Sequence, residues 1–184
     1  KEFIFQMQGV SKTLDNGKKI LSNINLSFFP GAKIGVLGSN GSGKSTLLKI
    51  MAGVDSEYDG VALPQAGAKI GYLPQNPVLV GETVIDAIND AVKETRQLLE
   101  KYAELSLKIG DEKLSDTEKI KLSNEWARLQ DAIDAKDGWE LERNVERALD
   151  ALRCPPGEAK NAVLSGGERR RMALCGLLLG RPDL

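Results

Sequence analysis

The sequence predicts an α/β protein with an antiparallel β subdomain and an inserted pair of antiparallel helices. Three observations lead to this prediction. A glycine-rich loop stands between a short apolar run and a helical pattern. Apolar residues recur at every second position near the start of the chain, and residues 82–150 show helical spacing with almost no glycine and no proline. These patterns are typical of a strand–loop–helix unit, of paired strands and of amphipathic helices, respectively.

The β segments are predicted from alternation and turn residues. Phe3–Met7 and Ile20–Phe28 flank the turn sequence Asp15–Gly17, so we expect an antiparallel pair. Ala32–Leu37 and Lys69–Leu73 are short apolar runs of the kind buried in a sheet. Tyr58–Gly60 is predicted to be a turn, and Ser45–Ala52 fits a helix that Gly53 can end.

Residues 82–150 predict two long helices joined by a turn at residues 110–113. Each helix is expected to exceed 20 residues, or about 30 Å at 1.5 Å per residue. Ser115–Glu118 has the pattern of a capping box at the start of the second helix. A third helix is expected from Trp139 to Leu152, and both tryptophans, Trp126 and Trp139, are expected to pack within this region rather than stack on bases.

Composition excludes several classes of protein. The 184 residues are 41% hydrophobic and 28% charged, with a net charge of −1, which excludes a collagen-like fibre, a long disordered tail and a disulfide scaffold. No apolar run approaches the ~20 residues that cross a bilayer, and we expect a cytoplasmic protein. Cys154 and Cys175 are expected to be free thiols, with Cys175 in the core. The absence of histidine excludes Ser-His-Asp catalysis within this chain.

Charge is distributed unevenly along the chain. Residues 82–150 carry 18 acidic and 11 basic side chains, whereas the rest of the chain carries 8 acidic and 14 basic ones. The near-neutral total therefore conceals a basic core and an acidic helical insert. A solvated helical face explains such an excess equally well, so charge alone assigns no partner.

The glycine-rich loop matches the phosphate-binding pattern G-x-x-x-x-G-K-[ST]. Glycine permits the tight turns that point successive N–H groups at a phosphate, and the helix that follows directs its positive end at the anion. Lys44 is predicted to contact the β- and γ-phosphates, and the Ser45 hydroxyl to bind Mg²⁺. A glycine-rich turn without a ligand is the alternative. The predicted ATP-binding residues are Gly38, Ser39, Asn40, Gly41, Ser42, Gly43, Lys44, Ser45 and Thr46.

Two further motifs follow the loop. Leu164–Glu168 reads Leu-Ser-Gly-Gly-Glu and precedes Arg169–Arg171, and Gln75 ends a predicted strand. Taken alone, Ser-Gly-Gly before a helix also fits a plain N-cap, and Gln75 also fits a plain turn residue. The three motifs in this order resemble the ATP-binding-cassette (ABC) family, and the resemblance covers essentially the whole chain.

That resemblance implies the P-loop NTPase core of an ABC ATPase, with ATP and Mg²⁺ as its ligands. In the family, two cassettes pair head to tail, and ATP lies between the Walker A loop of one and the signature of the other. A second ABC domain is therefore an implied partner, and Gln75 is implied to reach Mg²⁺ together with Ser45. The implied signature residues are Ser165, Gly166, Gly167 and Glu168.

The domains implied by the resemblance follow the changes in composition. Residues 1–81 form the ATP-binding core with the Walker A loop and Gln75. Residues 82–150 form the inserted helical arm, and residues 151–184 form the signature segment of the ABC domain.

The long insert between Gln75 and the signature is similar to that of the ABC-F branch, whose members carry two cassettes on one chain and no membrane domain. This resemblance implies a translation factor that binds the ribosomal E site, contacts tRNA, rRNA and the L1 stalk, and couples ATP to elongation. Two alternatives stay open. One is the nucleotide-binding subunit of an ABC membrane transporter, and the other is an ABC-F protein that protects ribosomes against antibiotics.

The sequence departs from the family pattern in three respects. Leu14 stands where many cassettes stack an aromatic ring on adenine, so base selectivity is in question. The arm is acidic, which favours a basic ribosomal protein over RNA, although Lys93, Arg96, Lys101 and Lys108 allow a basic stripe. The chain stops at Leu184, before the family's Walker B strand and catalytic glutamate, so no catalytic residue is assigned and we expect nucleotide binding without turnover.

Overall fold

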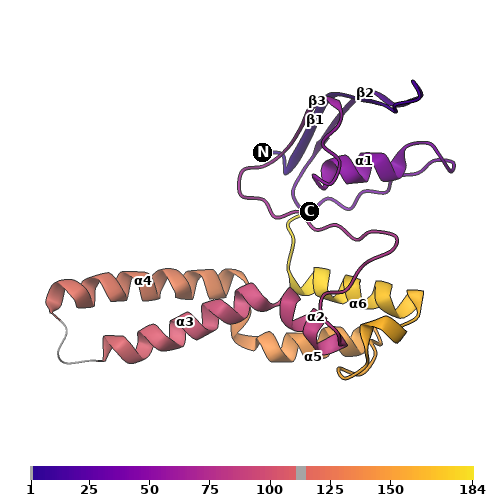
Figure 1. Ribbon diagram of the computed structural model, residues 1–184. Helices are drawn as coiled ribbons and strands as arrows, with labels where there is room; N and C mark the ends of the chain where they lie inside the picture. The colour runs from indigo at the N-terminus through magenta and orange to yellow at the C-terminus, as the bar shows by residue number, and fades with distance from the viewer. Residues whose placement is uncertain (1, 111–114) are drawn as a thin grey trace. The chain divides into compact units, whose positions relative to one another are not determined.

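The computed structural model describes residues 2–110 and 115–184, which form two compact units (Figure 1). Unit 1 runs to Tyr72 and includes Pro182–Leu184, and unit 2 comprises Leu73–Arg181. Each unit has its own apolar core. The predicted turn at residues 110–113 lies, apart from Gly110, outside the described residues. The predicted division at 81/82 and 150/151 follows composition and stays a prediction.

Unit 1 contains a three-stranded antiparallel sheet with the order β2–β1–β3 (Figure 1). β1 (Phe5–Thr13) and β2 (Lys19–Phe28) pair antiparallel around the turn at Asp15–Gly17, with Phe5 opposite Phe28. The predicted hairpin is therefore confirmed. Alternating side chains of β1 are buried, as expected for a strand with one face on a core.

The core of unit 1 lies between this sheet and helix α1 (Lys44–Met51). The predicted helix is confirmed, and it turns Leu47 and Ile50 inward, where they are 8% and 3% exposed. The spacing of three residues places both side chains on one face of the helix. The buried core consists of Ile4, Phe5, Met7, Val10, Leu21, Phe28, Leu47 and Ile50.

The predicted turn at Tyr58–Gly60 is wrong, because β3 (Asp59–Pro64) begins there. β3 pairs antiparallel with the free edge of β1, and the pairing shifts register beside Gly60. Gly60 has φ +95°, and a Cβ at this position would lie 2.6 Å from the Gly9 carbonyl oxygen. The turn residues produce a local shift in register, but the segment forms a strand because the edge of β1 offers backbone groups that need hydrogen-bond partners.

The predicted strands Ala32–Leu37 and Lys69–Leu73 are also wrong. Ala32–Leu37 is irregular and exposed, with Leu37 at 94%, and none of the described residues pairs with it as a strand. Lys69–Gly71 does exchange backbone hydrogen bonds with Asp183–Leu184, including Gly71 N–H to Leu184 O at 2.8 Å, but the pairing is too short to form a strand. Apolar composition favours a strand only where a neighbour supplies hydrogen bonds.

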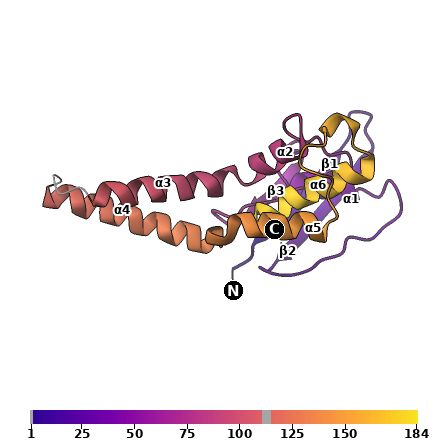
Figure 2. The ribbon, with the colours of Figure 1, turned by 90° about the horizontal axis from the view of Figure 1, so that it is seen from below.

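The regular elements in the described part of unit 2 are all helices, apart from an isolated bridge between Thr83 and Lys160. Helices α3 (Lys93–Ile109) and α4 (Asp116–Ala135) lie antiparallel and side by side in both views, and they form the predicted arm (Figures 1 and 2). α4 begins with the predicted capping box, in which the Ser115 hydroxyl and the Glu118 carboxylate cap each other's backbone N–H groups. The elements are α2 (Val84–Ala91), α3 (Lys93–Ile109), α4 (Asp116–Ala135), η1 (Gly138–Glu140), α5 (Leu141–Ala151), η2 (Asn161–Val163) and α6 (Gly166–Leu179).

The predicted first long helix is broken into α2 and α3 at Val92. Val92 has φ −101° and ψ 3° and is 1% exposed, and no glycine or proline marks the break. Val84, Ile88 and Val92 all enter the core of unit 2, whereas α3 packs along α4. Since one straight helix cannot follow both surfaces, burial of Val92 redirects the chain.

An aromatic cluster joins the arm to the return helix. The Tyr102 ring stacks on Trp126 with centroids 5.0 Å apart and meets Trp139 edge-on at 4.9 Å. The Trp126 indole N–H donates to the Ser106 hydroxyl at 2.8 Å. The prediction that both tryptophans pack within this region is confirmed.

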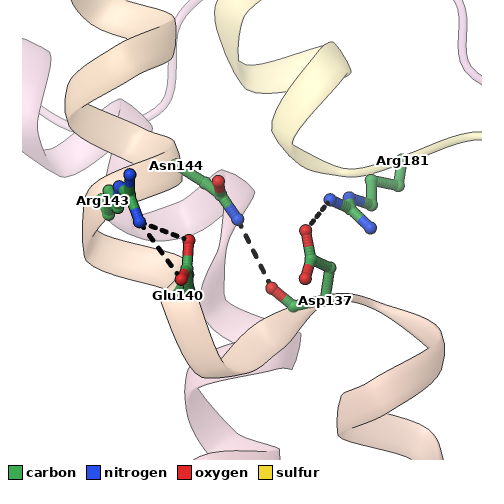
Figure 3. A network of polar contacts seen from close by, with 5 residues as sticks. All are labelled: Asp137, Glu140, Arg143, Asn144 and Arg181. Atoms are coloured by element: carbon green, nitrogen blue, oxygen red, sulfur yellow. Dashed lines mark hydrogen bonds and ion pairs between the residues drawn. The ribbon is translucent and has the colours of Figure 1, made fainter.

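A polar network lies beside this cluster, at the junction between α4 and α5 (Figure 3). The Arg181 guanidinium donates to the Asp137 carboxylate at 2.7 Å, and the Asn144 amide donates to the Asp137 backbone carbonyl at 3.4 Å. Glu140 and Arg143 form a separate ion pair at 3.1 Å, one turn apart. The end of α6 is thus tied to the base of the arm.

Candidate nucleotide-binding site

Residues 38–43 form a loop of unit 1 that leads directly into α1 at Lys44. Gly43 is the N-cap of α1 and adopts a left-handed conformation with φ +92°, and Gly41 has φ +80°. Between them, the Ser42 N–H donates to the Ser39 carbonyl at 3.2 Å. Left-handed residues at this spacing curl the backbone, as in the anion-binding nests of phosphate sites.

The Lys44 side chain folds back over this loop. Its Nζ donates to the carbonyl oxygens of Gly38 and Ser39, each at 2.7 Å, and lies 3.4 Å from the Ser42 hydroxyl. A lysine held by neutral carbonyls gains from exchanging them for phosphate oxygens, because a hydrogen bond between two oppositely charged groups is stronger than one to a neutral acceptor. The lysine is therefore placed to bind a phosphate chain that enters the loop.

Two glycines of the loop stand where no side chain fits. A Cβ on Gly38 would lie 2.6 Å from the Ser42 hydroxyl oxygen, inside the curl of the loop. A Cβ on Gly43 would lie 3.0 Å from Leu21 Cδ2 and 3.1 Å from the Ile20 carbonyl oxygen. Gly43 also needs its positive φ, and the short contacts that a Cβ would make with Leu21 and Ile20 show that the backbone packs tightly on β2 at this point. These residues fit a triphosphate.

Ser45 is the second residue of α1, and its side chain is exposed. Within the described residues its hydroxyl has no hydrogen-bond partner, so the oxygen is available to a hard cation such as Mg²⁺. Gln75 belongs to unit 2, and its pairing with Ser45 at one metal ion stays a prediction.

Gln75 lies in an irregular segment of unit 2. Its backbone carbonyl accepts a hydrogen bond from Arg170 Nε at 2.8 Å, whereas its side chain is exposed. Together with Asn76, Pro77, Gly166 and Arg169, these two residues line a small polar cavity. The structure therefore brings Gln75 next to the predicted signature helix, a proximity that no sequence pattern indicated.

The signature segment forms the N-terminus of α6, and it is an N-cap as the simpler interpretation expects. The Ser165 hydroxyl donates to the Glu168 carboxylate at 2.7 Å and accepts from the Glu168 N–H at 3.2 Å. These bonds from the Ser165 hydroxyl and backbone N–H hold the pKa of Glu168 below its usual range. Ser165, Gly166 and Gly167 are exposed, so a ligand can reach this helix end.

Asn161 organises the loop before the signature, and sequence reasoning did not single it out. It is 8% exposed, and its Nδ2 donates to the carbonyls of Val80, Gly81 and Thr83 at 3.0–3.3 Å. Its own N–H donates to the Glu82 carbonyl at 2.8 Å. Its Oδ1 is buried without a partner among the described residues. Three carbonyls around one amide fix the segment that leads into α2.

A buried ion pair in unit 1 was also missed. Lys12 is 9% exposed, and its Nζ donates to the Asp55 carboxylate at 2.7 Å and to the Glu57 carbonyl at 2.8 Å. The Lys12 bond holds the pKa of Asp55 below its usual range. Next to this pair, Leu14 lines a shallow pocket and is 41% exposed. A lone lysine in an alternating strand gave no signal that it would be buried.

Other predicted features have clear positions. Cys175 is fully buried in the core of unit 2, as predicted, and burial raises the pKa of its thiol to about 12. Among residues 2–110 and 115–184, no three His, Cys, Asp or Glu side chains gather as a metal site. Every helix in this part of the chain is too short or too polar to traverse a bilayer.

Sequence comparisons agree with this geometry. The family model for ABC transporters matches residues 21–184. The chain is 52% identical to the energy-dependent translational throttle protein EttA of Haemophilus influenzae and 44% identical to that of Mycobacterium tuberculosis, over its full length. It is also 37% identical, over 97% of its length, to the tylosin resistance ATP-binding protein TlrC of Streptomyces fradiae. The chain spans only 32–33% of these relatives.

Solved structures support the same fold. The chain aligns with an inward-facing metal-chelate-type ABC transporter at a TM-score of 0.56 and 18% identity, covering 97% of this chain and 57% of that one. It aligns with CbiO1 of Clostridium perfringens at 0.53 and 21%, covering 99% and 63%. At this identity the likeness concerns the fold alone. With the family model matching nearly nine-tenths of its length, the chain belongs to the ABC transporter family of ATP-binding domains.

Proposed function

We propose that this chain is part of the first cassette of an ABC-F translation factor that acts at the ribosomal E site and couples ATP to elongation. The observation that carries the proposal is the 52% identity to the throttle protein across all 184 residues. That identity spans the arm as well as the nucleotide motifs, and the arm is the part that ATP binding alone does not require. The second cassette, the E-site tRNA, rRNA and the L1 stalk are the proposed partners.

Different residues are proposed to bind different parts of ATP and Mg²⁺. The curled backbone of residues 38–43 and the start of α1 present N–H groups to the phosphates, and Lys44 supplies a positive charge. Ser45 and Gln75 would hold Mg²⁺, which neutralises phosphate charge when bound. Ser165, Gly166 and Gly167 would contact ATP on the partner cassette, which requires the Ser165 hydroxyl to turn from the Glu168 carboxylate.

The chain alone is proposed to bind nucleotide without turning it over. Hydrolysis needs a carboxylate that takes a proton from the attacking water. The only glutamate among the predicted site residues is Glu168, whose carboxylate is occupied by the cap. We expect no steady-state ATP hydrolysis by the purified chain; hydrolysis that disappears in Lys44→Ala would contradict this.

The arm is proposed to contact basic ribosomal protein more than RNA. Its acidic excess disfavours the phosphate backbone. Arg96, one member of the predicted basic stripe, is engaged by Glu142 at 2.8 Å and by the Asn89 side chain at 2.8 Å. Neutralisation of this arginine by an acidic neighbour leaves a weaker stripe than the sequence suggested.

Cosedimentation tests the proposal. The chain is mixed with 70S ribosomes and a non-hydrolysable ATP analogue with Mg²⁺, and the ribosome pellet is assayed for the chain. We expect nucleotide-dependent pelleting that Lys44→Ala weakens. Glu158→Gln, an exposed change outside the arm, the loop and the signature residues, serves as a folding control. Binding to permease-containing vesicles in place of ribosomes would overturn the proposal in favour of a transporter subunit.

A role in ribosome protection is the second candidate, supported by the 37% identity to TlrC. The two functions differ in their response to antibiotics. A protection factor restores translation by ribosomes stalled with a macrolide, whereas a throttle factor changes elongation in its absence. In vitro translation with and without tylosin separates the two.

A further inference from the structure

The segment 73–79 of unit 2 has no regular secondary structure, yet it carries Gln75, which is predicted to reach Mg²⁺. Apolar side chains hold the C-terminal part of the segment, since Pro77 is buried and Leu79 packs on the core of unit 2. The N-terminal part is held by one hydrogen bond. Within the described part of the chain, the Gln75 carbonyl is the only backbone group of residues 73–79 that takes part in a hydrogen bond.

The donor of that bond is Arg170, on the second turn of α6. Nε of arginine is part of a rigid planar group, so a bond at 2.8 Å through this atom fixes direction as well as distance. Arg170 stands five residues after Ser165, the N-cap of the same helix. A displacement of Gln75 is therefore passed to the helix that presents Ser165, Gly166 and Gly167.

We propose that Arg170 is a positioning residue that couples the Gln75 segment to the N-terminus of α6. The inference rests on the proposed function, in which Gln75 responds to nucleotide and Mg²⁺ and α6 presents the signature. One side chain then joins a group that serves the chain's own nucleotide to a group that serves the nucleotide of the partner cassette. Loss of Arg170 frees Gln75 from α6 without removing either predicted contact with ATP.

Arg169 provides a matched control. It precedes Arg170 on the same helix, lines the same cavity and is exposed, but its side chain makes no hydrogen bond within the described residues. Arg169→Ala and Arg170→Ala remove the same charge from the same helix. A difference between the two variants therefore isolates the bond to Gln75.

NMR of the whole chain tests the coupling in two steps. In Arg170→Ala, the amide order parameters at Asn76 and Val78 should fall from about 0.85 towards 0.6 or below, with no change in Arg169→Ala. MgATP should shift the amides of residues 38–46 in all three proteins. It should also shift those of Gly166 and Gly167 in the wild type and Arg169→Ala, but not in Arg170→Ala.

The outcomes separate the two claims. If residues 38–46 do not respond to MgATP in the wild type, the proposed function fails. If they respond but Arg170→Ala leaves the order parameters and the Gly166 and Gly167 shifts unchanged, the coupling is overturned and the proposed function stands. Arg170→Lys keeps the charge and the aliphatic stem and guards against loss of folding. It should behave like Arg170→Ala, and wild-type behaviour would show that charge alone, not the Nε bond, positions Gln75.

Discussion

Arg181 and Asp137 lie 44 positions apart in the sequence, yet their side chains meet at 2.7 Å and join the end of α6 to the base of the arm (Figure 3). Both residues have left-handed backbones, with φ +47° and +50°. Their side chains are 48% and 60% exposed. An exposed ion pair of this kind contributes little to the free energy of unfolding, because solvent and salt screen the charges.

Asp137→Asn should lower the free energy of unfolding of unit 2 by less than about 1 kcal/mol. Asparagine tolerates the left-handed conformation, so the substitution removes the charge without adding strain. Urea unfolding followed by tryptophan fluorescence measures the change, since both tryptophans lie in unit 2. Asp131→Asn, an exposed change on α4, is the control. A double-mutant cycle with Arg181→Ala should give a coupling that shrinks in 1 M salt, and a coupling insensitive to salt would contradict this account.

Lys12→Met should destabilise unit 1 by about 2–4 kcal/mol, because it leaves the Asp55 carboxylate largely buried without its partner. Amide exchange of β1 measures the effect, since unit 1 contains no tryptophan. Lys33→Met, at an exposed position, should change little. If Lys12→Met lowers the stability of unit 1 no more than Lys33→Met does, the ion pair does not stabilise the unit.

The same pair predicts a pH dependence. The pKa of Asp55 is lowered in the folded state, chiefly by the Lys12 bond. The pair therefore contributes fully to the free energy of unfolding when the pH is above the ordinary value of 3.8. This contribution is lost as pH falls through the lower, folded-state pKa. In Lys12→Met this acid-side loss should disappear, and an unaltered acid slope would exclude the assignment.

Gly43→Ala should cost more than Gly41→Ala. Both glycines have a positive φ, near which an alanine is strained by roughly 1–2 kcal/mol. At Gly41 a Cβ meets nothing within 4 Å, whereas at Gly43 it presses on Leu21 and Ile20 at 3.0–3.1 Å. We expect Gly43→Ala to lower the stability by about 1 kcal/mol or more beyond Gly41→Ala, because the loop packs tightly on β2 at Gly43. Equal losses of thermal stability in the two variants would contradict the contact.

The cap at α6 should titrate with Glu168. The Ser165 hydroxyl and N–H lower its pKa from the ordinary value of 4.5, so the cap is intact above that pH and opens as pH falls through the folded-state pKa. NMR titration should show the pKa returning towards its ordinary value in Ser165→Ala. Glu168→Gln keeps an acceptor and should remove the acid-side fraying of α6. Fraying at the same pH in Glu168→Gln would point to another group.

Local chemistry was sufficient where neighbours in sequence decide the structure. The hairpin at Asp15–Gly17, the helix after Gly43 and the cap at Ser115 depend on residues a few positions apart, and each was predicted correctly. The loop at residues 38–45 belongs to the same class, because glycine conformations and one lysine suffice to shape it.

Strand formation was decided by tertiary partners. Ala32–Leu37 has the composition of a buried strand but no neighbour among the described residues, whereas Asp59–Pro64 has a turn sequence and became a strand on the free edge of β1. A backbone hydrogen-bond ladder needs two segments, and the second is absent from any local window.

Sequence alone determined the glycine-rich loop, the capped helices and the acidic arm, because each depends on conformational preferences and spacings within one segment. Tertiary structure alone decided that Val92 bends the first helix, that Lys12 finds Asp55 and that Arg170 reaches Gln75. Each of these depends on which distant atoms lie within about 3–4 Å, and hydrogen bonds and packing at that range leave no trace in local composition.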